Sequence, residues 1–280
     1  MKKKNNLNIN DLYLDIIQGK LLEQSSWYDL HNMDRCRSIS KRVARQFLTM
    51  QRTLGTTCFM EIGAHEAAFS LDVRQEYPDA HIYAFEANPY VYNKYCTQFT
   101  SERGLNINYR NIAVGNYDGM INFLLAKEIS GVKESPESSR NSFLPRVGTG
   151  HRYESTVVPI TRLASFAQEE ALLKETFCLW IDTEGASRQV LEGAESLLPR
   201  VTSMLIEVEL EPIWEGQWTV GPLILWCRER GFIPVLRDFA RPKQFNCLFV
   251  NSDFYARAEH SIWRYIQFSI AERLDYIKGI

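Results

Sequence analysis

The chain has 280 residues, of which 45% are hydrophobic and 24% are charged, and 32 basic against 34 acidic side chains give a formal net charge of −2. This composition excludes a disordered chain, a collagen-like repeat and a coiled coil. The near-neutral charge provides no bulk attraction to nucleic acid or to an anionic membrane, so neither is expected as a partner.

The first residues do not predict an export signal. Lys2, Lys3 and Lys4 are not followed by the apolar stretch that a signal peptide needs. No window approaches the roughly 18 apolar residues of a membrane span. The cysteines form no C-x-x-C pair, which leaves a zinc or redox site without sequence support. We therefore expect a reduced, cytoplasmic protein.

Helical spacing of apolar residues predicts amphipathic helices at residues 11–22 and 34–54, within an N-terminal helical extension over residues 1–54. Short apolar runs then alternate with helical patterns. Strands are predicted at residues 58–62, 81–85, 107–114, 120–125, 154–160, 177–181, 203–208, 232–236 and 245–250. Helices are predicted at residues 67–77, 89–102, 162–173, 187–198 and 221–230, with a C-terminal helix at residues 253–280.

Strands that alternate with helices indicate an α/β fold, in which helices cover both faces of a mostly parallel sheet. About eight residues separate the last two strands, too few for a crossover, so we expect an antiparallel strand near the C-terminal end. The sheet-bearing domain is predicted at residues 55–252. It contains a polar, lid-like insertion at about residues 126–153, whose length is typical of a functional lid or a disordered segment.

The insertion is rich in basic side chains. Arg140, Arg146 and Arg152 would suit an acidic acceptor, because arginine forks bind carboxylates and phosphates. Neighbouring glutamates can balance the charge instead. We favour this second interpretation, a solvated loop.

Acidic residues end several predicted strands at their carboxyl ends, the edge where open parallel sheets bind ligands. Glu61 precedes the glycine turn at Gly63, and Glu86 ends the next strand. Later strands end at Asp182, Glu184, Glu207 and Glu209. An acid beside the turn suits a cationic group such as a sulfonium, and the dinucleotide fingerprint G-x-G-x-x-G is absent. A carboxylate at position 86 can accept two hydrogen bonds from a ribose diol.

The stretches that carry this chemistry resemble the FkbM family of S-adenosylmethionine-dependent methyltransferases, in the family's order and spacing across about residues 57–250. They are FMEIGAH (59–65), AFEANP (84–89), NIAVG (111–115), IDTEGA (181–186), VLEGA (190–194) and LIEV (205–208). The resemblance implies a class I Rossmann-like fold with a mostly parallel seven-stranded sheet. It also implies S-adenosylmethionine as cofactor and O-methylation of a hydroxyl on a sugar or another natural-product-like small molecule.

The resemblance further implies which residues contact the cofactor. The methionine part would be lined by Glu61, Gly63 and Ala64, and the ribose would be held by Glu86 with Asn88 beside it. The adenine would lie near Asn111, Ile112 and Ala113. The methyl-transfer centre would be faced by Asp182 and Glu184.

An oxygen acceptor needs a base within reach of its hydroxyl proton. Asp182 and His65 are the preferred catalytic candidates. Further candidates are Glu207, Glu209 and His151. A divalent metal held by Asp182 with Glu184 or His65 is an alternative way to activate the acceptor, although the preferred prediction contains no metal.

Several positions depart from the family pattern, and they cluster on the acceptor side. His65 stands for the usual Asn, Ala67 for Gly, Ala87 for Pro, Trp180 for Lys and Ser187 for Glu. The acceptor is therefore predicted only as a small molecule, such as a glycan or sugar intermediate. An amine N-methyltransferase and a cofactor-binding protein without turnover are the alternatives. The terminal helices offer surfaces through which two copies could form a homo-oligomer.

Overall fold

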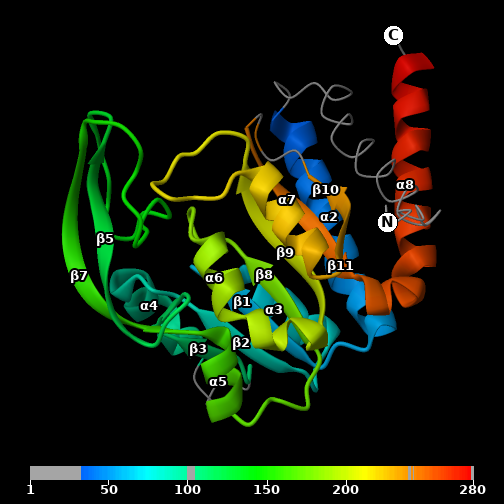
Figure 1. The fold of residues 1–280 in the computed structure, drawn as a ribbon. Coiled ribbons are helices and arrows are strands. Elements are labelled where there is room, and N and C mark those ends of the chain that lie inside the picture. Colours follow the sequence, from blue (N-terminus) through cyan, green and yellow to red (C-terminus); the bar gives the residue numbers. More distant parts are fainter. Residues whose placement is uncertain (1–32, 100–104, 239–240, 242, 279–280) are drawn as a thin grey trace, which may run out of the picture.

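A computed structural model describes residues 33–99, 105–238, 241 and 243–278 of the chain. At its centre is a seven-stranded sheet in the order β10-β11-β9-β8-β1-β2-β3 (Figure 1). The strands are β1 (Cys58–Ile62), β2 (His81–Phe85), β3 (Asn108–Arg110), β8 (Phe177–Ile181), β9 (Val201–Glu209), β10 (Phe232–Arg237) and β11 (Gln244–Asn251). Strand β11 is antiparallel to both neighbours, whereas the other pairs are parallel. This confirms the predicted Rossmann-like α/β fold.

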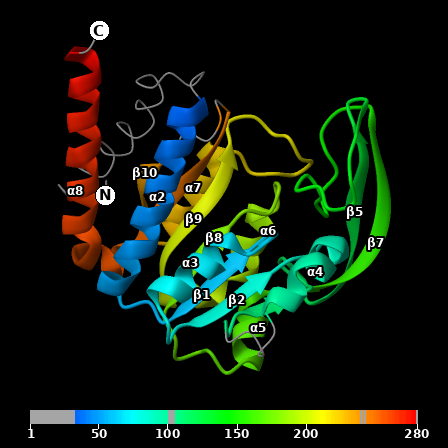
Figure 2. The same cartoon turned by 180° about the vertical axis from the view of Figure 1, so that it is seen from behind.

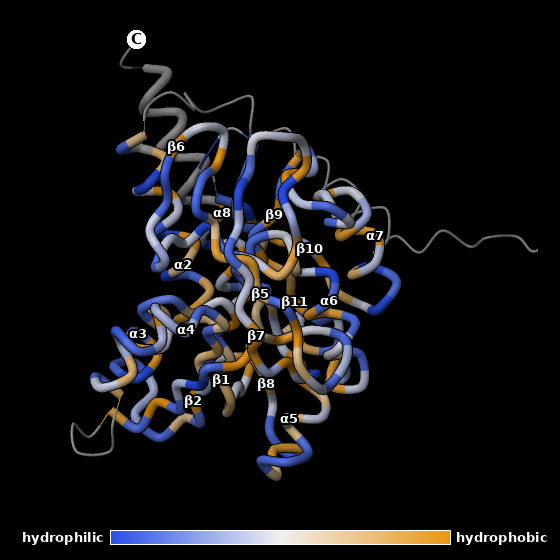
Figure 3. Tube along the Cα trace, turned by 90° about the vertical axis from the view of Figure 1, so that its left-hand side faces the viewer, coloured by the Kyte–Doolittle hydropathy of each residue, from blue (hydrophilic) through white to orange (hydrophobic). Residues whose placement is uncertain are grey.

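Helices cover both faces of this sheet, as Figure 2 shows from behind. Alternate side chains of β1 pack against the helices on the two faces, since successive residues of a strand point to opposite sides of the sheet. Met60 packs in the cluster that contains α5 (Leu163–Glu169), α6 (Ser187–Gly193) and α7 (Val220–Glu229). Phe59 packs in the other cluster, with residues of α2 (Met33–Leu54), α3 (Ala68–Glu76) and α8 (Ser252–Lys278). In Figure 3 the hydrophobic colour follows the strands, and hydrophilic segments lie mainly at outer turns.

Helix α2 corresponds to the helix predicted at residues 34–54. Its apolar stripe is almost completely buried, at Cys36, Ile39, Val43, Phe47, Met50 and Leu54. One polar residue of α2, Gln51, is fully buried as well. Its side-chain oxygen accepts hydrogen bonds from Thr56 (2.8 Å) and Ser203 (3.0 Å), so α2 is tied to the sheet by polar as well as apolar contacts. The other predicted N-terminal helix, at residues 11–22, lies outside the described residues.

A second sheet lies beside the first, with the strand order β4-β7-β5-β6. Its strands are β4 (Ala113–Val114), β5 (Gly119–Ile129), β6 (Val132–Lys133) and β7 (His151–Thr161). The antiparallel β5–β7 ribbon extends on the side of the molecule opposite α8 (Figures 1 and 2). Strands β5 and β7 reach into residues 126–153, the stretch predicted as lid-like, and residues 134–150 connect β6 to β7.

The single strand predicted at residues 107–114 is wrong in its continuity. Residues 108–110 pair with β2 in the main sheet, whereas residues 113–114 pair with β7 in the second sheet. The chain changes sheets at Asn111, whose side-chain amide donates to the main-chain oxygens of Glu86 (2.8 Å) and Ala87 (3.2 Å). An apolar pattern alone cannot show this change of partner, because both segments are extended and partly buried.

Short 3₁₀ turns complete the described chain. The predicted helix at residues 89–102 is a shorter α4 (Pro89–Tyr95) followed by η2 (Cys96–Phe99). The helix predicted at residues 187–198 likewise ends at Gly193 and continues as η4 (Glu195–Arg200). None of the described helices combines the length and the apolar character that a membrane crossing requires.

Candidate active site

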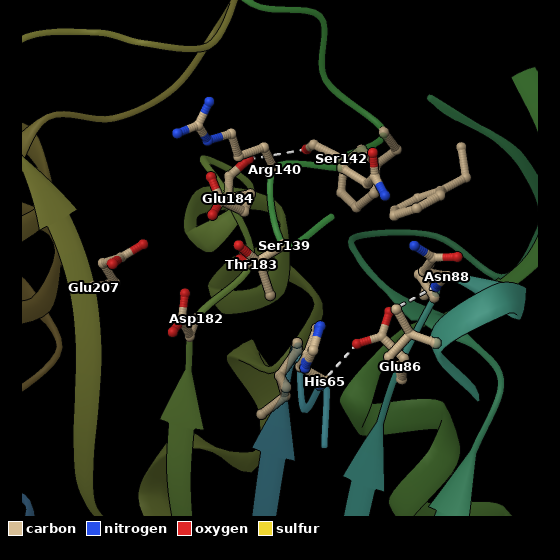
Figure 4. Close-up of a pocket in the computed structure, with 18 of the residues that line it drawn as sticks. His65, Glu86, Asn88, Ser139, Arg140, Ser142, Asp182, Thr183, Glu184 and Glu207 are labelled. Atoms are coloured by element: carbon tan, nitrogen blue, oxygen red, sulfur yellow. Dashed lines mark hydrogen bonds between the residues drawn. The ribbon is translucent and has the colours of Figure 1, made fainter. Parts of the chain in front are cut away.

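A cavity of about 410 Å³ opens at the carboxyl ends of β1, β2, β8 and β9. Residues 138–143 of the β6–β7 loop form part of its wall, together with Arg146 (Figure 4). The cavity is lined by these predicted site residues: Gly63, His65, Glu86, Asn88, Ile112, Ala113, Asp182 and Glu184. Three predicted cofactor contacts do not line it, namely Glu61, Ala64 and Asn111. The sheet topology thus brings most of the predicted site together.

Glu61 turns away from the cavity. It lies on the same face of β1 as Phe59, beneath α3. Its carboxylate accepts hydrogen bonds from the main-chain N–H groups of Phe69 (3.2 Å) and Ser70 (2.8 Å), and from the Ser70 hydroxyl (2.6 Å). Burial raises its pKa to about 7. Glu61 therefore fixes the first turn of α3, and its contact with the methionine part of a cofactor stays a prediction.

Gly63 forms the junction between two neighbouring strand ends. Its φ is +80°, a left-handed conformation that favours glycine. A Cβ atom there would lie 1.8 Å from the main-chain oxygen of Asp182. On the other side of the contact, the Asp182 amide donates to the Ile62 oxygen (2.9 Å). Gly63 thus allows the turns after β1 and β8 to pack against each other.

Glu86 and Asn88 shape the cavity wall after β2. The Glu86 carboxylate accepts from the amides of His65 and Asn88, each at 2.7 Å. Asn88 caps helix α4, because its side-chain oxygen accepts from the Tyr90 amide (3.0 Å). Burial raises the pKa of Glu86, while these two amide donors lower it. Each carboxylate oxygen keeps further acceptor capacity toward the cavity.

Apolar side chains lie beside this carboxylate. They come from the turn after β3, from helix α4, from β5 and from the loop, at Val91, Ile112, Ala113, Phe123 and Phe143. The aromatic members were missed in the sequence, because Phe123 and Phe143 reach the cavity only through the second sheet. A carboxylate next to a flat apolar slot provides complementary surfaces for a ribose and a heteroaromatic base.

The opposite end of the cavity is rich in carboxyl groups. Asp182 and Glu184 follow β8, and Glu207 lies on the adjacent strand β9 (Figure 4). Burial raises the pKa of all three, that of Glu184 to about 8. Glu209, further along β9, has its pKa raised by burial to about 7 and accepts hydrogen bonds from Gln217 and Gln244. Close carboxyl groups in a poorly solvated site cannot all ionise, so this end favours protons or a cationic ligand.

The β6–β7 loop connects the two ends of the cavity. At the first end, the Asn88 side chain donates to the Pro136 oxygen (2.7 Å), and His65 Nε2 lies 3.3 Å from the Glu137 oxygen. At the second, the Ser142 hydroxyl donates to the main-chain oxygen of Glu184 (2.9 Å). The loop therefore contacts both walls.

The basic residues of the insertion make two kinds of contact. Arg140 pairs with Glu134 (2.8 Å), and Lys127 pairs with Glu154 (2.5 Å), in agreement with the balanced-charge interpretation. Arg146 differs, because its guanidinium lies 4.2 Å from the ring centre of Trp214 and 3.9 Å from the Glu184 carboxylate. Trp214 in turn packs against Gly185, where a Cβ atom would lie 2.4 Å from the indole. The glycine of the DTEGA stretch thus makes room for this tryptophan.

Other cavity residues had weak sequence signals. Thr183 lies between Asp182 and Glu184, and its buried hydroxyl has no hydrogen-bond partner in the structure. Arg241, before β11, and Gln244, the first residue of β11, also line the cavity, and no motif marks them. The candidate base His151 does not line the cavity, and its Nε2 lies 3.3 Å from the Val147 oxygen. Among the described residues, no group of three or more His, Cys, Asp or Glu side chains could hold a metal ion.

Comparison with known families identifies the family of the chain. A family model described as "Methyltransferase FkbM domain" matches residues 61–234, more than half of the chain. The chain belongs to the FkbM methyltransferase family. The matched segment begins at Glu61 and contains every predicted site residue. The match is to the methyltransferase domain that the resemblance implied.

Solved structures similar to this FkbM methyltransferase were also found. The methyltransferase FkbM from Methylobacillus flagellatus KT has 9% sequence identity and a TM-score of 0.44, over 70% of this chain and 43% of that one. TrmK of M. capricolum, solved with S-adenosylhomocysteine, has 11% identity and a TM-score of 0.39, over 73% and 67% of the two chains. Magnesium protoporphyrin IX methyltransferase of Synechocystis PCC 6803, solved with S-adenosylmethionine, has 9% identity and a TM-score of 0.37, over 89% and 99%.

The chain thus spans less than half the length of the first of these solved structures. A search of curated proteins gives no match.

The chemistry of the cavity fits the cofactor S-adenosylmethionine. The molecule combines a base, a ribose diol and a cationic sulfonium, in that order along its length. The cavity offers an apolar slot, the Glu86 carboxylate and a carboxyl-rich end. The unpartnered Thr183 hydroxyl at the carboxyl-rich end is a further group that a ligand can satisfy.

Proposed function

We propose that this FkbM methyltransferase transfers a methyl group to a hydroxyl oxygen of a polar, sugar-like small molecule. The observation that carries the proposal is the carboxyl group of Asp182. It lies at the cavity wall after β8, beside the side chain of Glu207 on the neighbouring strand. A carboxylate that is not held by a helix or a turn remains available to a hydroxyl proton.

The cofactor contacts that we assign are supported by the lining of the cavity. Glu86 would accept the ribose hydroxyls, and Ile112 with Phe143 would enclose the adenine. Asn88 positions the wall by capping α4 and by binding the Pro136 oxygen. We assign His65 to the same wall, because its amide binds Glu86 and its ring contacts the loop at Glu137. This assignment makes His65 a positioning residue, and Asp182 remains the candidate base.

The bound cofactor supplies a methyl group on a positively charged sulfur, which is already strongly electrophilic. The chain therefore has to hold the acceptor oxygen in line and remove its proton. Asp182 accepts that proton, and Thr183 donates a hydrogen bond to an acceptor oxygen. The loop residues Ser139 and Phe143 close the wall and reduce the access of water.

The acceptor end also has the features of a site for polar ring compounds. Hydrogen-bonding side chains come from different elements, at Ser139, Thr183, Arg146, Arg241 and Gln244. Such a mixture of acceptors and donors suits a molecule with several hydroxyl groups. These contacts support a glycan or sugar intermediate as the acceptor.

A second candidate is methylation of an amine. It is favoured by the excess of carboxyl groups at the acceptor end, where Asp182, Glu184 and Glu207 face the cavity. These groups would attract an ammonium group. The amine would still have to lose a proton before attack, so the same Asp182 would serve both reactions.

The proposal is tested in two steps. Calorimetry with S-adenosylhomocysteine first measures whether the cavity binds the cofactor product. Methyl-donor consumption is then measured with matched acceptors, a methyl hexoside, its amino-sugar counterpart and its deoxy counterpart. We expect turnover of hydroxyl compounds. Turnover of the amino sugar alone would support the second candidate, and cofactor binding with no turnover across a broad acceptor panel would indicate a binding protein.

A further inference from the structure

Glu207 and Asp182 form a pair of carboxyl groups at the wall of the cavity. Strands β8 and β9 are parallel, and Ile181 lies opposite Ile206. This register places the next residue of each strand, Asp182 and Glu207, side by side (Figure 4). Their side chains share a hydrogen bond, and both line the cavity.

A hydrogen bond between two carboxyl groups requires one proton for the pair, because two carboxylates present only acceptors. The surroundings decide which side chain carries it. The acids Asp182, Glu184 and Glu209 all raise the pKa of Glu207. Asp182 is near the acid Asp238, but the guanidinium of Arg241 lowers its pKa. This difference favours negative charge on Asp182 and the shared proton on Glu207.

We propose that Glu207 is a neutral, protonated positioning residue that donates its hydrogen bond to Asp182 and so orients the Asp182 carboxylate toward the acceptor. The inference rests on the proposed methylation of a hydroxyl, in which Asp182 is the base. Glu207 itself touches the reaction only through Asp182. The pair then carries one negative charge before the reaction begins.

This arrangement balances the chemical step. The acceptor O–H bond breaks and its proton passes to Asp182, while the oxygen forms the new bond to the methyl carbon. The bond between that carbon and the cofactor sulfur breaks, and its electron pair stays on the sulfur. Both carboxyl groups are then protonated, and the pair returns one proton to solvent before the next turnover.

Groups from every packed element contribute to the charge around the pair. The acids are Glu184 after β8, Glu209 on β9 and Asp238 after β10. The basic groups are His65 after β1 and Arg241 before β11. Mutations at these positions would shift the titration of the pair, so the test changes position 207 and leaves its surroundings intact.

The first measurement determines whether the Asp182–Glu207 pair holds one proton, and it needs no ligand. Glu207→Gln and the control Glu211→Gln are compared with the wild type by capillary electrophoresis at about pH 7.5, since net charge sets mobility. Glu211 is an exposed acid, with a side chain that is 65% accessible, so its replacement must shift the net charge by one unit. We expect Glu207→Gln to leave the net charge unchanged, because a neutral amide replaces a neutral acid. A full one-unit shift would overturn the proposal.

The second measurement asks whether Glu207 acts as a donor. Leucine at position 207 cannot donate, and we expect Glu207→Leu to lower kcat by roughly 10- to 100-fold, the usual effect of removing a partner that orients a reactive side chain. Glutamine keeps an N–H donor, so Glu207→Gln should recover most of this loss and preserve the acid limb of the pH profile. Loss of activity in Glu207→Gln equal to that in Glu207→Leu would overturn the proposal.

The two arms separate this inference from the proposed function. If the wild type methylates no hydroxyl compound, the proposed function fails, whereas the charge measurement still decides whether the pair holds one proton. Thermal unfolding of both variants shows whether they are folded. If Glu207→Leu does not fold, the charge and the pH profile of Glu207→Gln carry the decision.

Discussion

The carboxyl groups at the two ends of the cavity have different kinds of hydrogen-bond partners. At the β1–β2 end, main-chain amides bind Glu86, as other amides bind Glu61 outside the cavity beneath α3, so both side chains are fixed by the turns that surround them. At the β8–β9 end, Asp182 and Glu207 face each other, and Glu184 contacts Arg146 only at 3.9 Å. The first end is built before a ligand arrives, whereas the second retains unsatisfied charge and hydrogen-bonding capacity.

This difference matches the two tasks of a methyltransferase. One ligand, the cofactor, is the same in every turnover of the family, and fixed turns can bind it with little reorganisation. The acceptor end has to handle a proton as well as a ligand, which requires groups whose charge can change. Three substitutions and one pH series test this difference between the two ends of the cavity, in decreasing order of expected effect.

Asp182→Asn should lower kcat by removing the proposed base at the β8–β9 end of the cavity. The substitution keeps the size of the side chain but removes its capacity to accept a proton, and loss of a general base typically lowers the rate by about 10²–10⁴. Steady-state kinetics should show this fall in kcat, while calorimetry should show S-adenosylhomocysteine bound with nearly unchanged affinity. Normal kcat in Asp182→Asn would remove the residue from the mechanism.

Gly63→Ala should destabilise the protein by disturbing the contact between the turns after β1 and β8. The added Cβ atom would meet the Asp182 oxygen at 1.8 Å in a backbone with φ of +80°. We expect a loss of about 2–4 kcal/mol in the free energy of unfolding, from strain plus overpacking. Gly131→Ala is a matched control, because Gly131 has φ of +82° and no atom within 4 Å of the added Cβ. Equal losses in urea unfolding would show that the contact with Asp182 is unimportant.

Glu86→Gln should weaken the fixed end without changing the chemistry. The amide keeps one acceptor oxygen but loses the charge, and hydrogen bonds to charged groups contribute about 1.5–3 kcal/mol. Affinity for S-adenosylhomocysteine should therefore fall by roughly ten- to a hundredfold. Glu66→Gln, at an exposed neighbour, is the control. Unchanged affinity in Glu86→Gln would contradict the ribose assignment.

The pH dependence of stability should reveal the uncompensated acids of the reactive end. Burial raises the pKa of Glu184 from 4.5 to about 8. The folded protein therefore binds a proton that the unfolded chain has released, and this stabilisation is complete below pH 4.5 and is lost as the pH rises through about 8. Urea unfolding across this window should show a smaller decline in Glu184→Gln than in the wild type. The same decline in both proteins would show that Glu184 does not take part.

Much of the fold could be predicted because its determinants are local. Apolar runs, glycine turns and short connections defined the main sheet and its antiparallel strand. The second sheet could not be predicted, since the change of partner at Asn111 depends on contacts with the β2–α4 turn. In the same way, motifs marked Glu86 and Asp182, whereas Phe143 and Arg241 reach the cavity from segments without a motif.

Glu61 shows what the face of a strand adds to a sequence pattern. Its position beside Gly63 predicted a ligand contact, and in the structure strand alternation turns its side chain under α3. Counting from Phe59, which packs on the same face, would have placed Glu61 away from the cavity.

Helix α2 has a consequence for where this protein can be cut. The family match begins at Glu61, after both α2 and most of β1. A fragment that starts there would leave the apolar face of the sheet without Val43 and Phe47, and it would leave Ser203 without the oxygen of Gln51. The family match and the folding unit therefore have different boundaries in this chain. Expression of the matched segment alone should yield aggregated protein, whereas a fragment that begins ahead of Met33 keeps the layer that shields the sheet from solvent.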